Sequence, residues 1–204
     1  MTTILAFDTS GPYCDVAVLR NGDVLCHAHE AMTKGQAERL MPLIQEMMDT
    51  AGVAMTDLSA IGVGIGPGNF TGTRIAVAAA RGLALGLGIP AEGVGCVEAY
   101  ADGRDVTICL PAPRGQVHLG HHGHIATRDV DADLARDIEG PVAGPAAETV
   151  AAATGLQRVA TPSLSVAIAR IAQTRAAPDR PRPAPIYLRA ADAAPAADAP
   201  PTIL

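Results

Sequence analysis

The period of the hydrophobic residues changes several times within the first hundred positions, and this limits the fold more than any other feature. Residues 3–7 form an apolar run that predicts a buried strand. Asn21-Gly22, between two further apolar runs, predicts a hairpin, because both residues tolerate the positive φ of a type I′ turn. Residues 37–51 then follow a helical period. A strand at 60–65, a helix at 73–87 and a strand at 93–97 are expected next.

The second half repeats this order in a shorter form. Strands are predicted at 106–110 and 116–120, and helices at 145–154 and 163–175, the last with Ser163 as its N-cap. An alternation of strands and helices indicates two α/β lobes. We expect a first lobe over residues 1–100, a trimmed second lobe over 101–189, and a disordered tail over 190–204, where Pro and Ala dominate.

Composition excludes several classes of protein. Hydrophobic residues make up 49% of the 204 positions, which is enough to build a core. The net charge of −6 argues against a protein that binds nucleic acid alone, because phosphate binding needs clustered Lys and Arg. Four scattered cysteines give neither zinc spacing nor a disulfide framework. The start of the chain lacks the basic segment of a signal peptide, and no apolar run reaches the roughly 18 residues that span a bilayer. We therefore expect a soluble cytoplasmic protein without a membrane partner.

Two features of the first lobe could hold a nucleotide. Asp8, at the end of the first strand, could hold a magnesium ion, or it could cap the turn that follows. The glycine-rich loop at 66–72 could cradle a phosphate at the start of the next helix, or it could be a structural turn that locks helix to sheet. It lacks the lysine of a Walker A loop. The candidate nucleotide-binding residues are Asp8, Thr9, Gly66, Gly68, Asn69 and Thr71.

The histidines and nucleophiles give a weaker signal. His27 and His29 share one face of a strand, as do His122 and His124, so paired metal ligands are geometrically possible. No acid or cysteine completes a set at suitable spacing, so we expect solvated histidines and no metal site. No pairing of a nucleophile with a base is visible either, and we expect no catalytic residue.

The two helices of the first lobe each carry a continuous apolar face. Such a face is either internal core or an interface, where methionine and small residues let helices of two subunits pack closely. We predict that this face meets a partner. Its candidate residues are Leu40, Leu43, Ile44, Met47, Ala76, Ala79, Ala80 and Leu83.

Three segments together resemble the TsaB (YeaZ) family: ILAFDTS with CDVAVL, then GIGPGNFTGTRIAVAAARGLALGLGIP, and PIYLR near the end. The resemblance covers most of residues 1–100. It implies an actin-like ATPase fold with two lobes, each built on a ribonuclease-H-like sheet. It further implies a dimerisation scaffold that has no activity alone and pairs with the catalytic TsaD subunit. That subunit transfers threonylcarbamoyl to the adenosine beside the anticodon of tRNA.

The resemblance also implies partners and a cofactor. A small ATPase, TsaE, completes the system, the chain alone would form a homodimer, and tRNA would be reached only through the complex. ATP or ADP with magnesium could sit at the subunit interface. The catalytic relatives hold a metal through an H-x-x-x-H segment on the first helix, where this chain has Gln36 and Leu40, and Asn69 stands where the family loop usually has serine.

Two other functions remain open. The first is an ATP-dependent small-molecule kinase of the same fold superfamily. It would need a phosphate-binding segment in the second lobe, where only Ala143-Gly144-Pro145 is available. The second is a glycoprotease-like metallopeptidase, for which the two helix histidines are missing.

Overall fold

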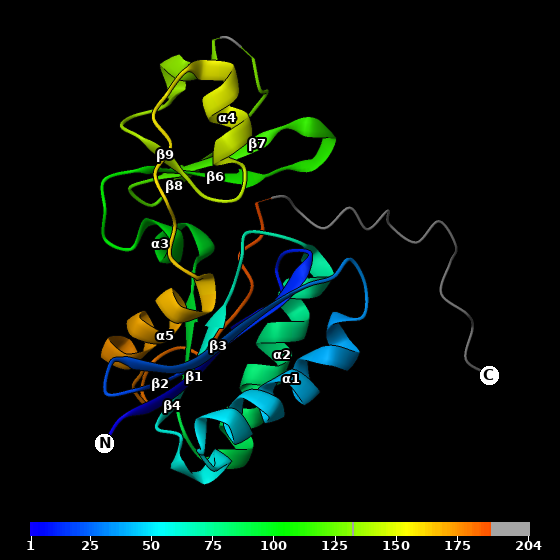
Figure 1. The fold of residues 1–204 in the computed structure, drawn as a ribbon, viewed down its shortest axis with the longest axis vertical. Coiled ribbons are helices and arrows are strands. Elements are labelled where there is room, and N and C mark those ends of the chain that lie inside the picture. Colours follow the sequence, from blue (N-terminus) through cyan, green and yellow to red (C-terminus); the bar gives the residue numbers. More distant parts are fainter. Residues whose placement is uncertain (132, 189–204) are drawn as a thin grey trace, which may run out of the picture.

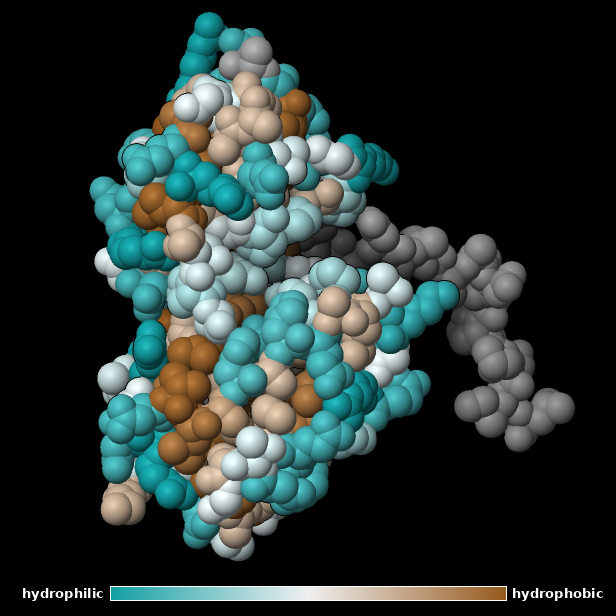
Figure 2. Space-filling model, viewed as in Figure 1, coloured by the Kyte–Doolittle hydropathy of each residue, from teal (hydrophilic) through white to brown (hydrophobic). Residues whose placement is uncertain are grey.

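The structure, a computed structural model, describes residues 1–131 and 133–188. The tail expected at 190–204 lies outside the described residues. Two α/β lobes are stacked end to end, and each contains one sheet (Figure 1). In the space-filling view the lobes meet at a narrower waist, and hydrophobic side chains gather mainly on the larger, lower lobe (Figure 2). The predicted α/β class with a reduced second lobe is confirmed.

The sheet of the first lobe has five strands in the order β3-β2-β1-β4-β5. β1 (Thr3–Asp8) lies at its centre, antiparallel to β2 (Tyr13–Arg20) and parallel to β4 (Ala60–Gly64). β3 (Asp23–Ala31) and β5 (Ala91–Val94) form the edges. The β2–β3 hairpin turns at Asn21-Gly22, both at positive φ, as the sequence predicts.

Helices cover both faces of this sheet, so β1 is fully buried (Figure 1). Leu5 and Phe7 face α1 (Gln36–Ala51) and α2 (Phe70–Leu87), whereas Ile4 and Ala6 face α5 (Leu164–Arg175). This alternation follows the two-residue period of a strand. Gly62 of β4 is needed for the close packing of α5, because a Cβ at this position would lie 2.9 Å from Ile168 Cγ2.

The second lobe is smaller. Its sheet has the order β8-β7-β6-β9, made by β6 (Thr107–Pro111), β7 (Val117–His121), β8 (His124–Arg128) and β9 (Val142–Ala143). α4 (Ala147–Thr154) covers one face. α3 (Cys96–Ala101) lies at the waist, between the other face and α5. The described residues also form three short 3₁₀ turns, at Met55–Asp57, Pro113–Gly115 and Leu134–Asp137.

The predicted second lobe, residues 101–189, is too long. Its sheet and helix end at Thr154, and α5 returns to the first lobe, where it packs on β1, β2 and β4. A buried hydrogen bond fixes this return, because Ser165 Oγ donates to Asp15 Oδ1 at 2.8 Å. The segment after α5 also lies on the first lobe, where Ile186 N donates to the Ile65 carbonyl.

Two element boundaries differ from the prediction by three residues. α2 begins at Phe70 rather than at residue 73, because Asn69 is its N-cap. The helix therefore starts inside the glycine-rich segment that was expected to be a loop. The strand expected at 93–97 ends at Val94, and α3 starts at Cys96. Within the described parts of the chain, no helix combines the length and the apolar character that a membrane crossing requires.

Candidate functional site

The turn after β1 and the glycine-rich loop are locked to each other. Thr9 Oγ1 donates to the Gly72 carbonyl at 2.7 Å, and Asn69 N donates to the Ser10 carbonyl at 2.6 Å. A Cβ on Gly72 would lie 1.9 Å from Thr9 O, and one on Gly68 would lie 2.5 Å from Ser10 O. The glycines therefore admit the protein's own backbone, not an anion. Of the two interpretations of this loop, the contacts favour the structural turn.

Asn69 is occupied as the N-cap of α2. Its side-chain oxygen accepts from Gly72 N at 2.8 Å and satisfies a backbone donor that the first turn leaves free. Thr71 lies within that first turn and is exposed. Asn can replace the serine of the family loop here because both residue types cap helices well.

Asp8 is completely buried, and its two carboxylate oxygens differ. Oδ1 accepts from the backbone N and the hydroxyl of Ser10, both at 2.8 Å. Oδ2 is buried without a hydrogen-bond partner among the described residues, beside Gly64, where a Cβ would lie only 1.9 Å away. Burial raises the pKa of Asp8 to about 6, although the Ser10 hydrogen bonds and the nearby Tyr13 hydroxyl oppose this rise.

A cavity of about 310 Å³ opens beside this turn, between the lobes. Of the six candidate nucleotide-binding residues, only Gly68 and Asn69 line it, whereas Asp8, Thr9, Gly66 and Thr71 do not. None of the described lining residues is a lysine or an arginine, so the phosphates of a nucleotide would meet no cation. The described lining of this cavity therefore supplies no charged side chain for ATP or ADP with magnesium.

The kinase-type segment of the second lobe has a structural role. Gly144 has a φ of 102°, and a Cβ there would lie 2.6 Å from the Cys109 carbonyl of β6. Ala143 ends β9 and Gly144 packs against β6, so nothing in the geometry of this segment supports a kinase.

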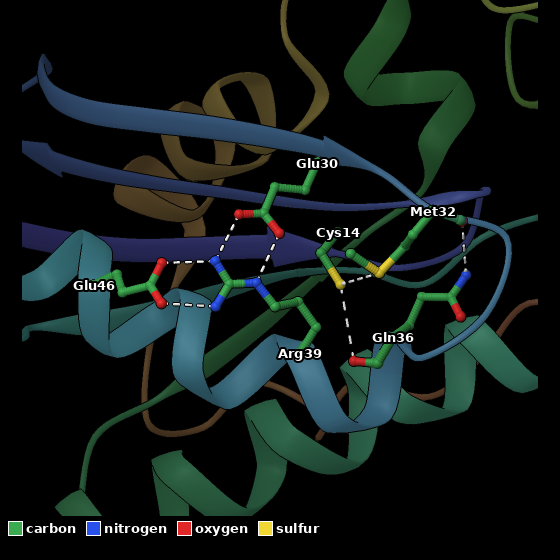
Figure 3. A network of polar contacts seen from close by, with 6 residues as sticks. All are labelled: Cys14, Glu30, Met32, Gln36, Arg39 and Glu46. Atoms are coloured by element: carbon green, nitrogen blue, oxygen red, sulfur yellow. Dashed lines mark hydrogen bonds and ion pairs between the residues drawn. The ribbon is translucent and has the colours of Figure 1, made fainter.

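The positions of the family's helix histidines hold no imidazole. Leu40 is buried in the core, and the Gln36 side chain donates to the Met32 carbonyl at 3.4 Å (Figure 3). Arg39, between them, binds Glu30 of β3 and Glu46 of α1 through both edges of its guanidinium group (Figure 3). Hydrogen bonds from Arg39 lower the pKa of both carboxyls. The Arg39–Glu30 ion pair and the buried Leu40 therefore attach this part of α1 to the sheet.

The predicted partner face is in fact the inner face of α1 and α2, so its assignment to a partner was wrong. Five of its eight residues are at most 1% exposed, namely Leu40, Leu43, Ile44, Ala76 and Ala80. Met47, Ala79 and Leu83 are half-buried against the same core. Helical spacing shows which side of a helix is apolar, but not whether a sheet or another subunit covers it.

The outer side of the same helices carries a different surface. Ala78, Arg81, Gly82, Leu85 and Gly86 are exposed on α2 at helical spacing. Leu85 is 78% exposed, and a Cβ at Gly82 or Gly86 would meet nothing within 4 Å. On α1, Met41 is also exposed. We call these six residues the outer face. The sequence analysis noted the small residues of this helix but selected Ala76, Ala79 and Ala80, because they share their spacing with bulkier apolar residues.

The histidines have acidic neighbours that their spacing did not predict. Asp15 lies 2.8 Å from His27 Nε2 and 3.7 Å from His29 Nδ1. His122 is brought together with His121 and Asp105, not with His124. The expectation that no acid completes a histidine set was therefore wrong.

Comparisons with known proteins agree with this fold. A family model described as TsaD, tRNA N6-adenosine threonylcarbamoyltransferase, matches residues 30–183, about three quarters of the chain. The tRNA threonylcarbamoyladenosine biosynthesis protein TsaB of Escherichia coli K12 is 40% identical over 58 residues. The chain belongs to the TsaD/TsaB (YeaZ) family. The match to the E. coli TsaB covers 28% of this chain and only 25% of that relative's length.

Solved structures extend the likeness to the whole fold. A Pseudomonas aeruginosa protein described as similar to the peptidase YeaZ superposes with a TM-score of 0.72 at 27% identity, covering 93% of this TsaB-like chain and all of that one. Component A of (R)-2-hydroxyglutaryl-CoA dehydratase from Acidaminococcus fermentans superposes with a TM-score of 0.57 at 11% identity, over 85% of this chain and 98% of its own. The second likeness shows the fold alone. The expected actin-like ATPase fold is thus confirmed.

Proposed function

We propose that this chain is a non-catalytic scaffold subunit in the formation of threonylcarbamoyladenosine on tRNA, and that it pairs with the catalytic TsaD subunit. Membership of the family supports this role, as does the name of the E. coli relative. In this proposal TsaE is the third component, the chain alone forms a homodimer, and tRNA binds through the complex. The net charge of −6 agrees with leaving tRNA phosphates to partners.

The outer face of α1 and α2 is the observation that carries the proposal. Glycine in an exposed helix is less favourable than alanine by roughly 1 kcal/mol, and α2 places Gly82 and Gly86 on one side, next to the exposed Leu85. A partner helix packed there would approach the backbone closely and would cover the leucine. Gln36 and Leu40 add support, because they replace the residues that bind a metal in catalytic relatives.

Gly82→Arg tests the pairing. The new side chain enters open space, so the monomer should keep its fold, while a partner helix would meet a bulky charge. We expect loss of co-purification with TsaD and loss of self-association, with circular dichroism and melting temperature close to wild type.

Ala152→Arg is the matched control, since Ala152 is exposed on a helix of the other lobe. A folded Gly82→Arg protein that still assembles would reject the outer face as the interface. Ala79→Arg is unsuitable, because half-buried Ala79 packs on the core.

A further inference from the structure

Asp105, His121 and His122 form a cluster of metal-type donors in the second lobe. Asp105 lies in the segment between α3 and β6, while His121 ends β7 and His122 begins the turn to β8. Asp105 Oδ1 is 2.9 Å from His121 Nε2 and 3.1 Å from His122 Nε2. One donor atom from each residue lies within 4.8 Å of the other two.

These distances are close to those of ligands on one small cation. Zn²⁺ binds imidazole nitrogen and carboxylate oxygen at about 2.0 to 2.2 Å, so two ligands on one ion are separated by about 3 to 3.5 Å. The two contacts to Asp105 Oδ1 lie at or near this range. Two of the three donors are neutral imidazoles when unprotonated, which suits zinc, nickel, copper or iron rather than magnesium or calcium.

A surface ion pair explains the arrangement less well. One carboxylate oxygen serves both rings, although two imidazolium cations with ring centroids 4.0 Å apart would repel each other. Exposed pairs of this kind stabilise a fold by only about 0–1 kcal/mol. Two Nε2 atoms and one carboxylate oxygen converge here, and one cation could take all three as ligands.

The surroundings leave the cluster open to a ligand and orient it. Glu139 Oε2 lies 3.7 Å from His121 Nδ1, on the opposite side of the ring from Asp105. Without a metal, His121 Nε2 is 2.9 Å from Asp105 Oδ1. With a cation bound between these two atoms, the Nδ1–H of His121 would face Glu139 and the Nε2 lone pair would face the metal. The side chains of Asp105 and His122 are 79% and 70% exposed, and all three residues line a cavity of about 750 Å³ at the waist.

We propose that Asp105, His121 and His122 bind one divalent transition-metal ion of the Zn²⁺ class, with Glu139 orienting His121. Three protein ligands leave at least one coordination position for water or another ligand. The site belongs to the second lobe, and the outer face belongs to the first. Either one can therefore fail without affecting the other.

The test is a titration of the tag-free, full-length chain with Zn²⁺ in competition with a chromophoric chelator. We expect one ion per chain, and a rise in Kd of roughly tenfold or more in Asp105→Ala, His121→Ala and His122→Asn. Asn suits position 122 because His122 has a φ of 46°, in the left-handed region. His29→Ala is the matched control: it removes an exposed histidine outside the cluster that also lies near an aspartate, at 3.7 Å, and Kd should not change.

Co²⁺ provides a second readout, because its visible absorption reports imidazole coordination. The wild-type chain should show these bands, and the His122→Asn protein should lose them. Folding is checked by circular dichroism, and His122 is exposed enough to be replaced without loss of the fold. The proposal is overturned if the wild-type chain shows no saturable binding of Zn²⁺, or if folded His122→Asn binds it as tightly as wild type.

Discussion

Asp8 is an ionisable residue with no exposed surface, and its two oxygens have different environments. Ser10 satisfies Oδ1, while Oδ2 is buried without a hydrogen-bond partner among the described residues. Burial raises the pKa of Asp8 from 3.8 to about 6, so the folded protein holds this proton more tightly than the unfolded chain does. The ionised form therefore destabilises the fold. This penalty is complete above pH 6, shrinks as the pH falls, and is absent below 3.8.

Asp8→Asn should stabilise the protein at neutral pH. Asn can keep the acceptor for Ser10 and removes the buried charge, and a shift of about two pKa units corresponds to about 3 kcal/mol. Urea denaturation at pH 7.5 and at pH 4 measures the difference, which should be large at the first pH and small at the second. Asp23→Asn, at an exposed position, is the control and should change little. An Asp8→Asn protein that is no more stable than wild type at pH 7.5 would contradict this account.

At the residue scale, the sequence predicted where a residue lies within its own element better than which side chains it contacts. It placed Asp8 at the end of a strand and the glycines in a loop between a strand and a helix, because both follow from the local pattern. It did not predict that Asp105 meets His121, since 16 positions separate them and they lie in different segments of the fold. Pairwise distances between side chains on different elements are decided by tertiary packing.

At the scale of elements, the start of α2 depends on an N-cap that was not predicted from the sequence. Asn69 accepts from Gly72 N, three positions ahead, so the helix starts inside the glycine-rich segment. Asn69→Ala should lower the free energy of unfolding by about 1 kcal/mol, while Asn69→Ser should stay close to wild type because serine also caps. Thermal or urea unfolding of the two variants checks this. Equal stability of the two would exclude the capping role.

Helical and strand periods predicted most elements to within a few residues, because burial of one side imposes the period. The same period could not predict what covers the buried side. The apolar stripe of α1 and α2 lies against the protein's own sheet. The outer face, half of which is glycine or alanine, has no periodic pattern of large apolar residues. A partner surface is therefore harder to predict from sequence than a core surface.

At the scale of the molecule, one hydrophobic cluster connects the two lobes. It contains Ile4 of β1, Ala99 of α3, Ile108 of β6 and Ile168 of α5. The sequence divided the chain at 101–105 and left α5 with the second lobe, because an apolar helix carries no local information about which sheet it will cover. With α5 and α3 packed between the sheets, the lobes share a core, and we expect them to unfold together.

Ile108→Ala tests this shared core, because Ile108 belongs to the second-lobe sheet and is completely buried in the common cluster. Removing its larger side chain should lower the free energy of unfolding by about 2–5 kcal/mol in a single transition. Hydrogen exchange should then accelerate by the same factor in β1 and in β7, since the slowest amides of a cooperative unit exchange through global unfolding. Val24→Ala, at an exposed strand position, is the control and should leave exchange in both strands near wild type. Faster exchange in β7 with unchanged exchange in β1 would mean that the lobes unfold separately despite the cluster between them.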